Sequence, residues 1–481
     1  MNQIVIAIDI GTTSTKALAV LPAGSVVAQH QEFYPTAFPK PGYAEQDANE
    51  ICNAVINSLQ AIANQINLSE SVAISFSSAM HSLVAVDANG RALAPLITWA
   101  DTRSVAQANQ LRNSDEGLPL QHETGTPVHP MSPLCKLIWM RESGVAEFQS
   151  AYKFISIKEF VWYRLTGEFK IDYSIASATG LFDIHQEVWS KKALKRAGIS
   201  SDQLSEAVPS TYQSFISLPA LKNLHHLPLL IGASDGCLAQ LGSNAMQPGV
   251  LTITLGTSGA VRRLASRQLH DPEGRLFNYL LTGDETVAGG ATNNGTAVMD
   301  WFVREMAESK ENLQTTISNA CTNVAAGSEG LLALPFLQGE RAPIYNPKAR
   351  GIFFNVSMQH TQQHFAHALL EGICYELKWI TESVETVCGP SDKIVVSGGI
   401  TRFPEWVQML ADVLNRTLFV TADHDASALG AAYLAFKAQG ISFQREAGAH
   451  TVFKPDVARI QSYEQGYRQF KMLYEAVKNL F

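Results

Sequence analysis

The fold is decided by residues 4–16, which read IVIAIDIGTTSTK. A short apolar run rich in Val and Ile predicts a buried strand. Asp9 lies where that strand ends, and Gly11 with the hydroxyl residues Thr12 and Thr13 predicts a tight turn before a second strand. Backbone N–H groups in such a turn can bind phosphate oxygens, and a carboxylate beside phosphates can bind Mg²⁺. An ordinary β-hairpin with a polar turn is the alternative.

The same pattern recurs about half a chain later. Residues 250–261 read VLTITLGTSGAV, which predicts strand, turn and strand, with Gly256 and Thr257 in the turn. The recurrence suggests two similar halves, and two such turns can hold one polyphosphate from both sides. The chain has no G-x-x-x-x-G-K-[ST] run and no G-x-G-x-x-G after a predicted strand, so we expect neither a P-loop nor a Rossmann site.

Length and composition are those of an enzyme with two large domains. The chain has 481 residues, of which 46% are hydrophobic and 17% charged, and a net charge of −8, which argues against nucleic-acid binding. Its six cysteines form no C-x-x-C pair and fit free thiols in a reducing compartment. The apolar start is too short for a signal peptide, and no run is long enough to span a membrane. We therefore expect a cytoplasmic enzyme without a membrane partner; a homodimer stays open.

A further strand end carries residues suited to a sugar. Residues 72–76 predict a short buried strand, and Met80 and His81 follow it. Ligands of α/β sheets lie at strand ends. His81 can bind a hydroxyl or a carboxylate there, or can be a histidine with its partners inside the protein.

Residues 96–103, LITWADTR, begin like another strand. Continued strand alternation predicts that Trp99, Asp101 and Arg103 share one face. Trp offers an apolar plate to a sugar, Asp accepts from hydroxyl groups, and Arg donates to oxygens or fixes the Asp. A surface Asp–Arg pair near a core Trp is the alternative.

Two later turns also follow apolar strands. Residues 229–237, LLIGASDGC, place Asp235 in a Gly-rich turn, where it can be a base or simply a turn residue. Residues 394–400, IVVSGGI, end in Gly398 and Gly399, which leave room for a planar adenine or a ribose against the backbone. A closely packed strand–helix turn is the alternative there.

Longer segments resemble one family. Residues 131–142, MSPLCKLIWMRE, resemble the first signature of the FGGY carbohydrate kinases, and the Ala-rich run 426–436 resembles the second. Residues 334–343 resemble the Gly-Glu-Arg-x-Pro element of xylulose and gluconate kinases, and residues 125–131, GTPVHPM, resemble the gluconate-kinase branch. The resemblance runs from Asp9 to about residue 440, although xylulose kinases carry similar pieces.

The resemblance implies a fold of the α/β class. It consists of two actin-like (ribonuclease H-like) ATPase domains with a cleft between them. We expect an N-terminal domain over residues 1–246, with the sugar site and the first phosphate turn, and a C-terminal domain over 247–481 that binds the nucleotide.

The resemblance also implies residue roles. Asp235 is expected to be the catalytic base and to approach Mg²⁺ together with Asp9. The expected ATP contacts are Gly11, Thr12, Thr13, Gly256 and Thr257 for the phosphates and Gly398 and Gly399 for the adenosine. The expected sugar contacts are Met80, His81, Trp99, Asp101, Arg103 and Asp235.

The expected reaction is transfer of the ATP γ-phosphoryl group to a terminal hydroxyl of D-gluconate, giving 6-phospho-D-gluconate. Gluconate is an anion, and His81 and Arg103 are the candidates for a cationic contact. A kinase for D-xylulose or another pentulose is the alternative, and a non-catalytic actin-like nucleotide-binding protein is a distant one.

Four features have no settled role in the sequence. Arg341 can meet a phosphate or can belong to a structural network with Glu340, and residues 293–295, NNG, can contact the nucleotide or act as a hinge. His360, His364 and His367 share one helix face, more suited to a polar stripe than to a zinc site. The stretch 172–183 can lie over the sugar, but the sequence does not place it.

Overall fold

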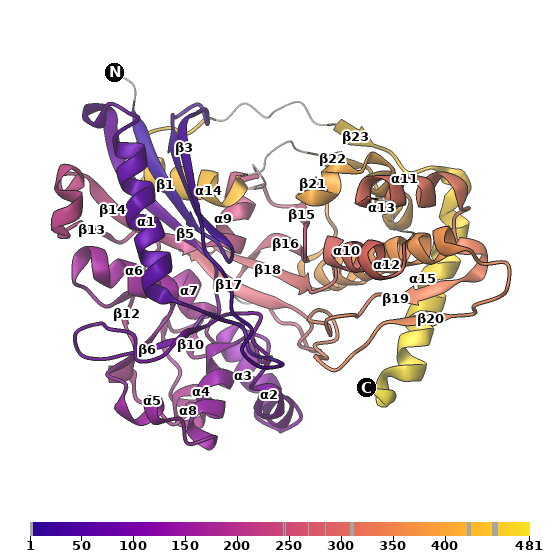
Figure 1. Cartoon of the computed structure of the whole chain (residues 1–481), viewed down its shortest axis with the longest axis horizontal. Helices are drawn as coiled ribbons and strands as arrows, with labels where there is room; N and C mark the ends of the chain where they lie inside the picture. The colour runs from indigo at the N-terminus through magenta and orange to yellow at the C-terminus, as the bar shows by residue number, and fades with distance from the viewer. Residues whose placement is uncertain are drawn as a thin grey trace. The chain divides into compact units, whose positions relative to one another are not determined.

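The computed structural model describes residues 3–243, 245, 247–267, 269–283, 285–307, 312–420, 425–444 and 451–481. The chain divides into two compact units (Figure 1). The first comprises Met1–Met246, Ala265–Val287 and Asp425–Glu446; the second comprises Gln247–Leu264, Ala288–His424 and Ala447–Phe481. The chain first passes from one unit to the other after residue 246, and two later segments return to the first unit.

A six-stranded sheet forms the centre of the first unit. Its spatial order is β13 (Gln213–Phe215), β14 (Pro228–Ser234), β5 (Ser71–Ser78), β1 (Ile4–Ile10), β2 (Ser14–Val20) and β3 (Val26–Phe33). Strands β14, β5 and β1 run parallel, whereas β2 and β3 continue antiparallel from β1. The carboxyl ends of the three parallel strands therefore meet at one edge, where Asp9, Ser77 and Asp235 lie.

Every second side chain of strand β1 faces one apolar cluster. Ile4, Ile6, Ile8 and Ile10 share an apolar cluster with Ile51, Val55, Leu59 and Ile62 of α1 (Ala48–Ala63). Asp47 begins that helix by accepting a hydrogen bond from the amide of Asn49. Because strand side chains alternate between faces, the odd-numbered side chains of β1, including that of Asp9, point to the opposite face.

Helix α14 (Ala426–Ala438) belongs to the first unit although it comes late in the sequence. It packs on β1, β5 and α9 (Asp235–Gly242). A Cβ atom at Gly430 would lie 2.0 Å from the carbonyl oxygen of Leu238, and one at Gly242 would lie 1.8 Å from that of Ala426. The small residues of α14 therefore allow close helix packing.

The other elements of the first unit surround this core. The helices are α2 (Val105–Arg112), α3 (Gly117–Thr124), α4 (Pro133–Glu142), α5 (Ala146–Ser150), α6 (Ile157–Thr166), α7 (Tyr173–Ser177) and α8 (Lys191–Ala197). The strands are β4 (Glu45–Gln46), β6 (Val84–Val86), β7 (Leu96–Ile97), β8 (Lys153–Ile155), β9 (Lys170–Asp172), β10 (Phe182–Asp183), β11 (Val188–Trp189), β12 (Glu206–Val208) and β17 (Phe277–Thr282).

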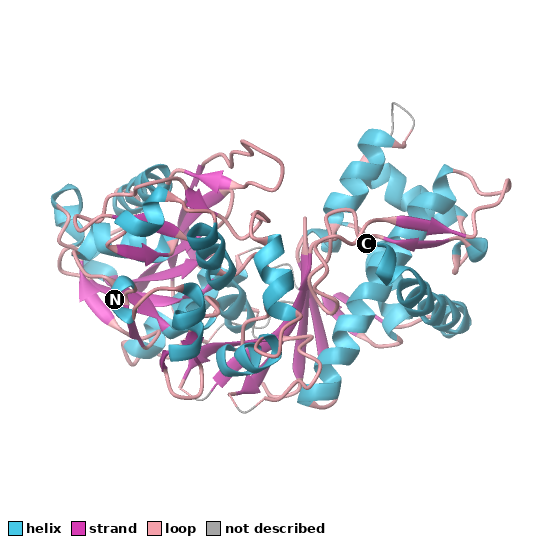
Figure 2. Cartoon of the chain, turned by 90° about the horizontal axis from the view of Figure 1, so that it is seen from below, coloured by secondary structure: helices cyan, strands magenta, loops and turns pink. Residues whose placement is uncertain are grey.

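Most of a seven-stranded sheet lies in the second unit. Six of its strands lie in the order β18 (Glu285–Thr292), β16 (Gly259–Ser266), β15 (Val250–Leu255), β21 (Lys393–Ser397), β22 (Leu418–Val420) and β23 (Thr451–Phe453), and β19 (Leu332–Leu334) pairs with β20 (Ile352–Phe354). The helices are α10 (Thr296–Glu305), α11 (Leu313–Asn323), α12 (Gln362–Cys388), α13 (Pro404–Leu414) and α15 (Val457–Val477). In each unit strands lie among helices (Figure 2).

The two predicted hairpins are present. Residues 11–13 join the antiparallel strands β1 and β2, and residues 256–258 join β15 and β16. The strand predicted for residues 96–103 is wrong in its second half. Strand β7 ends at Ile97, and the amide of Asp101 donates to the carbonyl of Thr98 in a turn.

Candidate active site

The first turn is held by its own backbone and by two side chains. The Gly11 amide donates to the Ser14 carbonyl at 3.0 Å. Tyr34 Oη donates to the Gly11 carbonyl at 2.7 Å, and Gln46 Nε2 donates to the Thr12 carbonyl at 2.6 Å. The carbonyl groups of the turn therefore have internal donors. Gly11 and Thr12 are half-buried and Thr13 is exposed, as a turn that receives a ligand requires.

An acidic group lies beside this turn. Ser77 Oγ donates to Asp9 Oδ1 at 2.7 Å, and Lys16 Nζ lies 2.6 Å from Asp425 Oδ1. Burial raises the pKa of Asp9 to about 6; the Ser77 hydrogen bond opposes the rise, and the negative charge of Asp235 adds to it. Asp9 and Asp235 are therefore close enough to repel one another, as two carboxylates that share a cation do.

Asp235 is the first residue of α9 and follows the end of β14. Its Oδ1 accepts from the Gly236 amide at 2.6 Å, and Ser427 Oγ donates to its carbonyl at 3.2 Å. A helix N-terminus favours a negative charge. The helix start thus orients the carboxylate that the sequence predicts as the base.

The donor set fits a hard divalent cation. Within the described ranges no group of three or more His, Cys, Asp or Glu side chains could hold a metal ion. Asp9 and Asp235 alone supply two carboxylates, and Mg²⁺ is commonly held by one or two carboxylates together with substrate phosphates.

His81 has an unusual backbone and defined ring contacts. Its φ is 68°, in the left-handed region. Lys136 Nζ donates to the His81 carbonyl and, at 2.8 Å, to that of Met131. Nδ1 of the ring lies 2.7 Å from the Ala178 carbonyl, and Nε2 lies 3.4 Å from Tyr279 Oη.

These contacts fix the tautomer of His81. The Ala178 carbonyl can only accept, so Nδ1 carries a proton; Nε2 accepts when the ring is neutral and donates when the ring is protonated. Burial lowers the pKa of Lys136 to about 7. Met80 is half-buried and packs beside a small apolar cluster that includes Ile175 and Phe182.

Trp99, Asp101 and Arg103 do not share the face of a strand, because residues 98–101 turn. Trp99 Nε1 donates to Thr12 Oγ1 at 2.9 Å, so the Trp contacts the turn between β1 and β2. Arg103 donates to Asp101 Oδ2 at 2.7 Å and to Glu45 Oε1 at 2.6 Å. Asp101 is 1% exposed.

The charges of this loop are therefore satisfied internally. Burial opposes the positive charge of Arg103, but its hydrogen bonds to Asp101 and Glu45 raise its pKa. The guanidinium carbon also lies 3.7 Å from the ring centre of Tyr43. An Asp–Arg pair is present, but Asp101 is buried rather than on the surface, and Trp99 is half-buried rather than in the core; the pair fixes the loop that carries Trp99.

In the second unit the two predicted glycine turns are neighbours. Strands β15 and β21 run parallel, so the turns after them meet. A Cβ atom at Gly398 would lie 2.7 Å from the Leu255 carbonyl oxygen, and one at Gly399 would lie 3.6 Å from Gly256 Cα. Gly398 also has φ 89°. The fold thus brings together Gly256, Thr257, Gly398 and Gly399.

Comparison with known proteins shows the family of the chain. Residues 4–242 match the N-terminal domain of the FGGY family of carbohydrate kinases, and residues 251–439 match its C-terminal domain. The chain belongs to the FGGY family of carbohydrate kinases. It is therefore an ATP-dependent carbohydrate kinase, with the two-domain α/β fold of the family.

Relatives of this FGGY kinase cover most of its length. It is 39% identical to a gluconokinase of Bacillus subtilis over 92% of this chain and 88% of the relative. It is 30% identical to a xylulose kinase of the same species over 99% and 97%. A gluconate kinase structure from Lactobacillus acidophilus superposes with a TM-score of 0.93 at 29% identity, covering 99% and 98%.

Sequence reasoning missed several residues of this FGGY kinase that lie beside the predicted ones. Ser77 touches Asp9, and Tyr279 lies against His81. Strand period alone places Ser77 level with Asp9 once β1 and β5 are paired. Tyr279 gives no such signal, because its segment is almost 200 residues from His81 in the chain.

The unplaced stretch 172–183 supports the strand that carries Asp235. Lys158 Nζ lies 2.8 Å from Asp172 Oδ2 and donates to the Ala233 carbonyl at 3.2 Å. Ser174 Oγ lies 2.9 Å from Ser234 Oγ. These groups are buried, so this stretch is a support beneath the end of β14.

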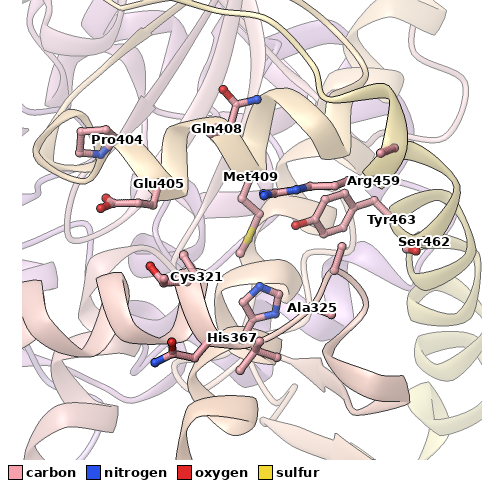
Figure 3. Close-up of a pocket in the computed structure, with 15 residues that line it drawn as sticks. Cys321, Ala325, His367, Pro404, Glu405, Gln408, Met409, Arg459, Ser462 and Tyr463 are labelled. Atoms are coloured by element: carbon pink, nitrogen blue, oxygen red, sulfur yellow. The ribbon is translucent and has the colours of Figure 1, made fainter.

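His367 of the predicted histidine stripe is buried within the second unit. His367 Nδ1 lies 2.8 Å from Ser328 Oγ, and burial lowers its pKa to about 3. Its ring lines a hollow of about 980 Å³ whose wall also includes Cys321, Glu405, Met409 and Arg459 (Figure 3). None of the predicted site residues lines it.

No helix of the described ranges combines the length and the apolarity that a membrane crossing requires.

Proposed function

We propose that this kinase transfers the γ-phosphoryl group of ATP, with Mg²⁺, to a terminal hydroxyl of D-gluconate and forms 6-phospho-D-gluconate. The observation that carries the proposal is the 39% identity to a gluconokinase, against 30% to a xylulose kinase of the same species. The 125–131 run, which resembles the gluconate-kinase branch, supports it.

Asp235 is proposed as the base that accepts the proton of the attacking hydroxyl. A base near the hydroxyl suffices, because phosphoryl transfer depends mainly on positioning and on neutralisation of charge. The position of Asp235 at the end of β14 and the start of α9 supports this role. When bound, Mg²⁺ would neutralise charge on the phosphates; Asp9 and Asp235 are the residues proposed to hold it.

The backbone turns are proposed to bind ATP. Gly11, Thr12 and Thr13, and in the second unit Gly256 and Thr257, are proposed for phosphate oxygens. Gly398 and Gly399 are proposed for the adenosine.

The sugar contacts are proposed around His81. Met80, His81 and Trp99 offer side chains to a linear sugar acid. Asp101 and Arg103 contribute mainly by fixing the Trp99 loop, because they neutralise one another. Protonated His81, in which Nε2 also donates, is therefore the stronger candidate for the gluconate carboxylate.

ADP release with Mg-ATP tests the proposal. The substrates are D-gluconate, D-xylulose, D-ribulose and glycerol, and Asp235→Asn is compared with Asp115→Asn, whose parent side chain is exposed. We expect gluconate to stimulate turnover in the native protein and in Asp115→Asn, and Asp235→Asn to be inactive. A preference for xylulose would favour the alternative pentulose kinase, and full activity of Asp235→Asn would refute the base assignment.

A further inference from the structure

Two acidic side chains lie together in the interior of the second unit. Glu340 follows β19 in the Gly-Glu-Arg element, and Glu376 lies in the middle of α12. They are 0% and 1% exposed. Both contact the hydroxyl of Thr292, the last residue of β18, at 2.9 and 3.1 Å. Two ionised carboxylates so close and so buried would repel strongly.

Glu340 has the partners of an ionised carboxylate. Its Oε1 accepts from the Asn293 amide at 3.0 Å and from the Arg341 amide at 2.6 Å. Its Oε2 accepts from Asn294 Nδ2 and faces the Thr292 hydroxyl. Three N–H donors and one hydroxyl stabilise a negative charge at this position.

Glu376 has the partners of a neutral acid. The Thr292 hydroxyl accepts from the Asn294 amide at 2.9 Å and has one proton to donate. That proton cannot serve both carboxyl groups. If the Thr292 hydroxyl donates its proton to Glu340, the contact with Glu376 is a hydrogen bond only when Glu376 is protonated and donates to Thr292 Oγ1.

Two further observations support a neutral Glu376. Within the described part of the chain, Glu376 Oε1 is buried without a hydrogen-bond partner, which would be costly for an ionised group. Burial, and then the charge of Glu340 and a hydrogen bond with its carboxyl group, raise the pKa of Glu376 well above its usual range, while the Thr292 hydrogen bond and then Arg341 oppose the rise. Glu340 and Arg341 come from the loop packed against α12, whereas β18 contributes the uncharged Thr292.

This network continues to the second glycine turn. The Thr296 amide, at the start of α10, donates to the Gly256 carbonyl at 2.7 Å, and the Ala297 amide donates to the Thr257 carbonyl at 3.3 Å. A Cβ atom at Gly295 would lie 2.3 Å from the Gly256 carbonyl oxygen. The short link 293–295 therefore transmits the position of Glu340 to the turn.

We propose that Glu376 is a neutral carboxylic acid that donates through Thr292 to an ionised Glu340, and that this relay positions the 256–258 turn for nucleotide phosphates. Glu376 and Glu340 are positioning residues that act through the backbone of 293–297. The nucleotide part rests on the proposed function of the turn, whereas the protonation of the pair does not.

Amide variants separate the two acids. Gln at position 376 can still donate to Thr292, so Glu376→Gln should leave the ATP dissociation constant within about twofold of the native value. Gln at 340 places an NH₂ group against N–H donors, so Glu340→Gln should weaken ATP binding about tenfold or more. Thr292→Val removes the relay and should weaken binding in the same direction. Glu371→Gln, another buried acid on α12, is the matched control and should not change ATP binding.

ATP binding is measured by calorimetry on the full chain without sugar, and unfolding is followed from pH 5 to 9. Because ionisation of Glu376 opposes folding, native stability should fall as pH rises above the usual Glu range, and Glu376→Gln should remove part of that fall. If Glu376→Gln weakened ATP binding and Glu340→Gln left it unchanged, the neutral and ionised acids would be the reverse of those assigned, and the proposal would be overturned. Equal losses of stability without any change in ATP binding would overturn the positioning role.

The design separates this proposal from the substrate assignment. If ATP binding follows the predicted order but gluconate gives no turnover, the substrate is wrong and the relay stands. If the native chain does not bind ATP, the substrate assignment and the positioning role are overturned, and the pH dependence of unfolding decides the protonation of the pair. If Glu340→Gln does not fold, the Glu376→Gln and Thr292→Val results still decide.

Discussion

Replacing Asp9 by Asn should stabilise the protein while abolishing its activity. The folded carboxyl has a pKa of about 6 against an ordinary value of 3.8, because burial and the charge of Asp235 disfavour its ionised form. Two pKa units correspond to about 3 kcal/mol, and partial exposure reduces this to about 1–3 kcal/mol. Asn keeps the size of the side chain, can still accept from Ser77, and carries no charge.

The sign of the pH dependence of stability follows from the protons that the folded and unfolded states bind. Between pH 3.8 and 6 the native state keeps a proton on Asp9 that the unfolded chain has lost. Native stability therefore falls as pH rises through this window, and Asp9→Asn does not share the fall. At pH 7 the apparent Tm of the variant should be about 2–8 °C above the native value, and near pH 4 the two should coincide.

Scanning calorimetry at pH 4, 5, 6 and 7 measures the difference in apparent Tm between Asp9→Asn and the native protein, with Asp115→Asn as the control at an exposed position. Mg-ATP should reduce the difference in apparent Tm between the variant and the native protein, because it stabilises the native protein by binding a carboxylate that the variant lacks. An Asp9→Asn variant no more stable than the native protein at pH 7 would refute the reasoning. So would a gain of the same size at pH 4.

Three further substitutions test the fold around the site. Gly430→Ala places a Cβ atom 2.0 Å from the Leu238 carbonyl oxygen and should cost about 2 kcal/mol or more in urea unfolding; an unchanged midpoint would contradict the close helix packing. Lys158→Met leaves Asp172 as an unpaired buried carboxylate and should cost about 3–5 kcal/mol, most of which Asp172→Asn in the same chain should restore; no recovery in the double variant would argue against the pair as the cause. Gly398→Ala forces a side chain into a backbone with φ 89° and should raise the KM for ATP more than that for the sugar; equal changes in both would place the effect elsewhere.

Local patterns predicted the parts of the site that a strand and its turn create together. The apolar runs before Gly11, Gly256 and Gly398 form strands, and each turn follows where the glycine ends the run. Parallel pairing then brings Gly256 and Gly398 together, as expected of a shared sheet edge.

Tertiary contacts decided the parts that the sequence did not predict. Alternation along 96–103 failed because Asp101 accepts from the Ala44 amide and Arg103 donates to Glu45, contacts with a segment more than 50 residues away. Tyr279 and helix α14 belong to the first unit only because the chain returns to it twice. Period and composition carry no information about such returns.

Competition between substrates tests the central claim most directly. Equal concentrations of D-gluconate and D-xylulose are incubated together with limiting Mg-ATP, and the two phosphorylated products are separated and counted. The product ratio equals the ratio of kcat/KM values. The proposal predicts 6-phospho-D-gluconate in about tenfold or greater excess, lost in Asp235→Asn and kept in Asp115→Asn. An excess of phosphorylated xylulose, or no phosphorylated gluconate, would contradict it.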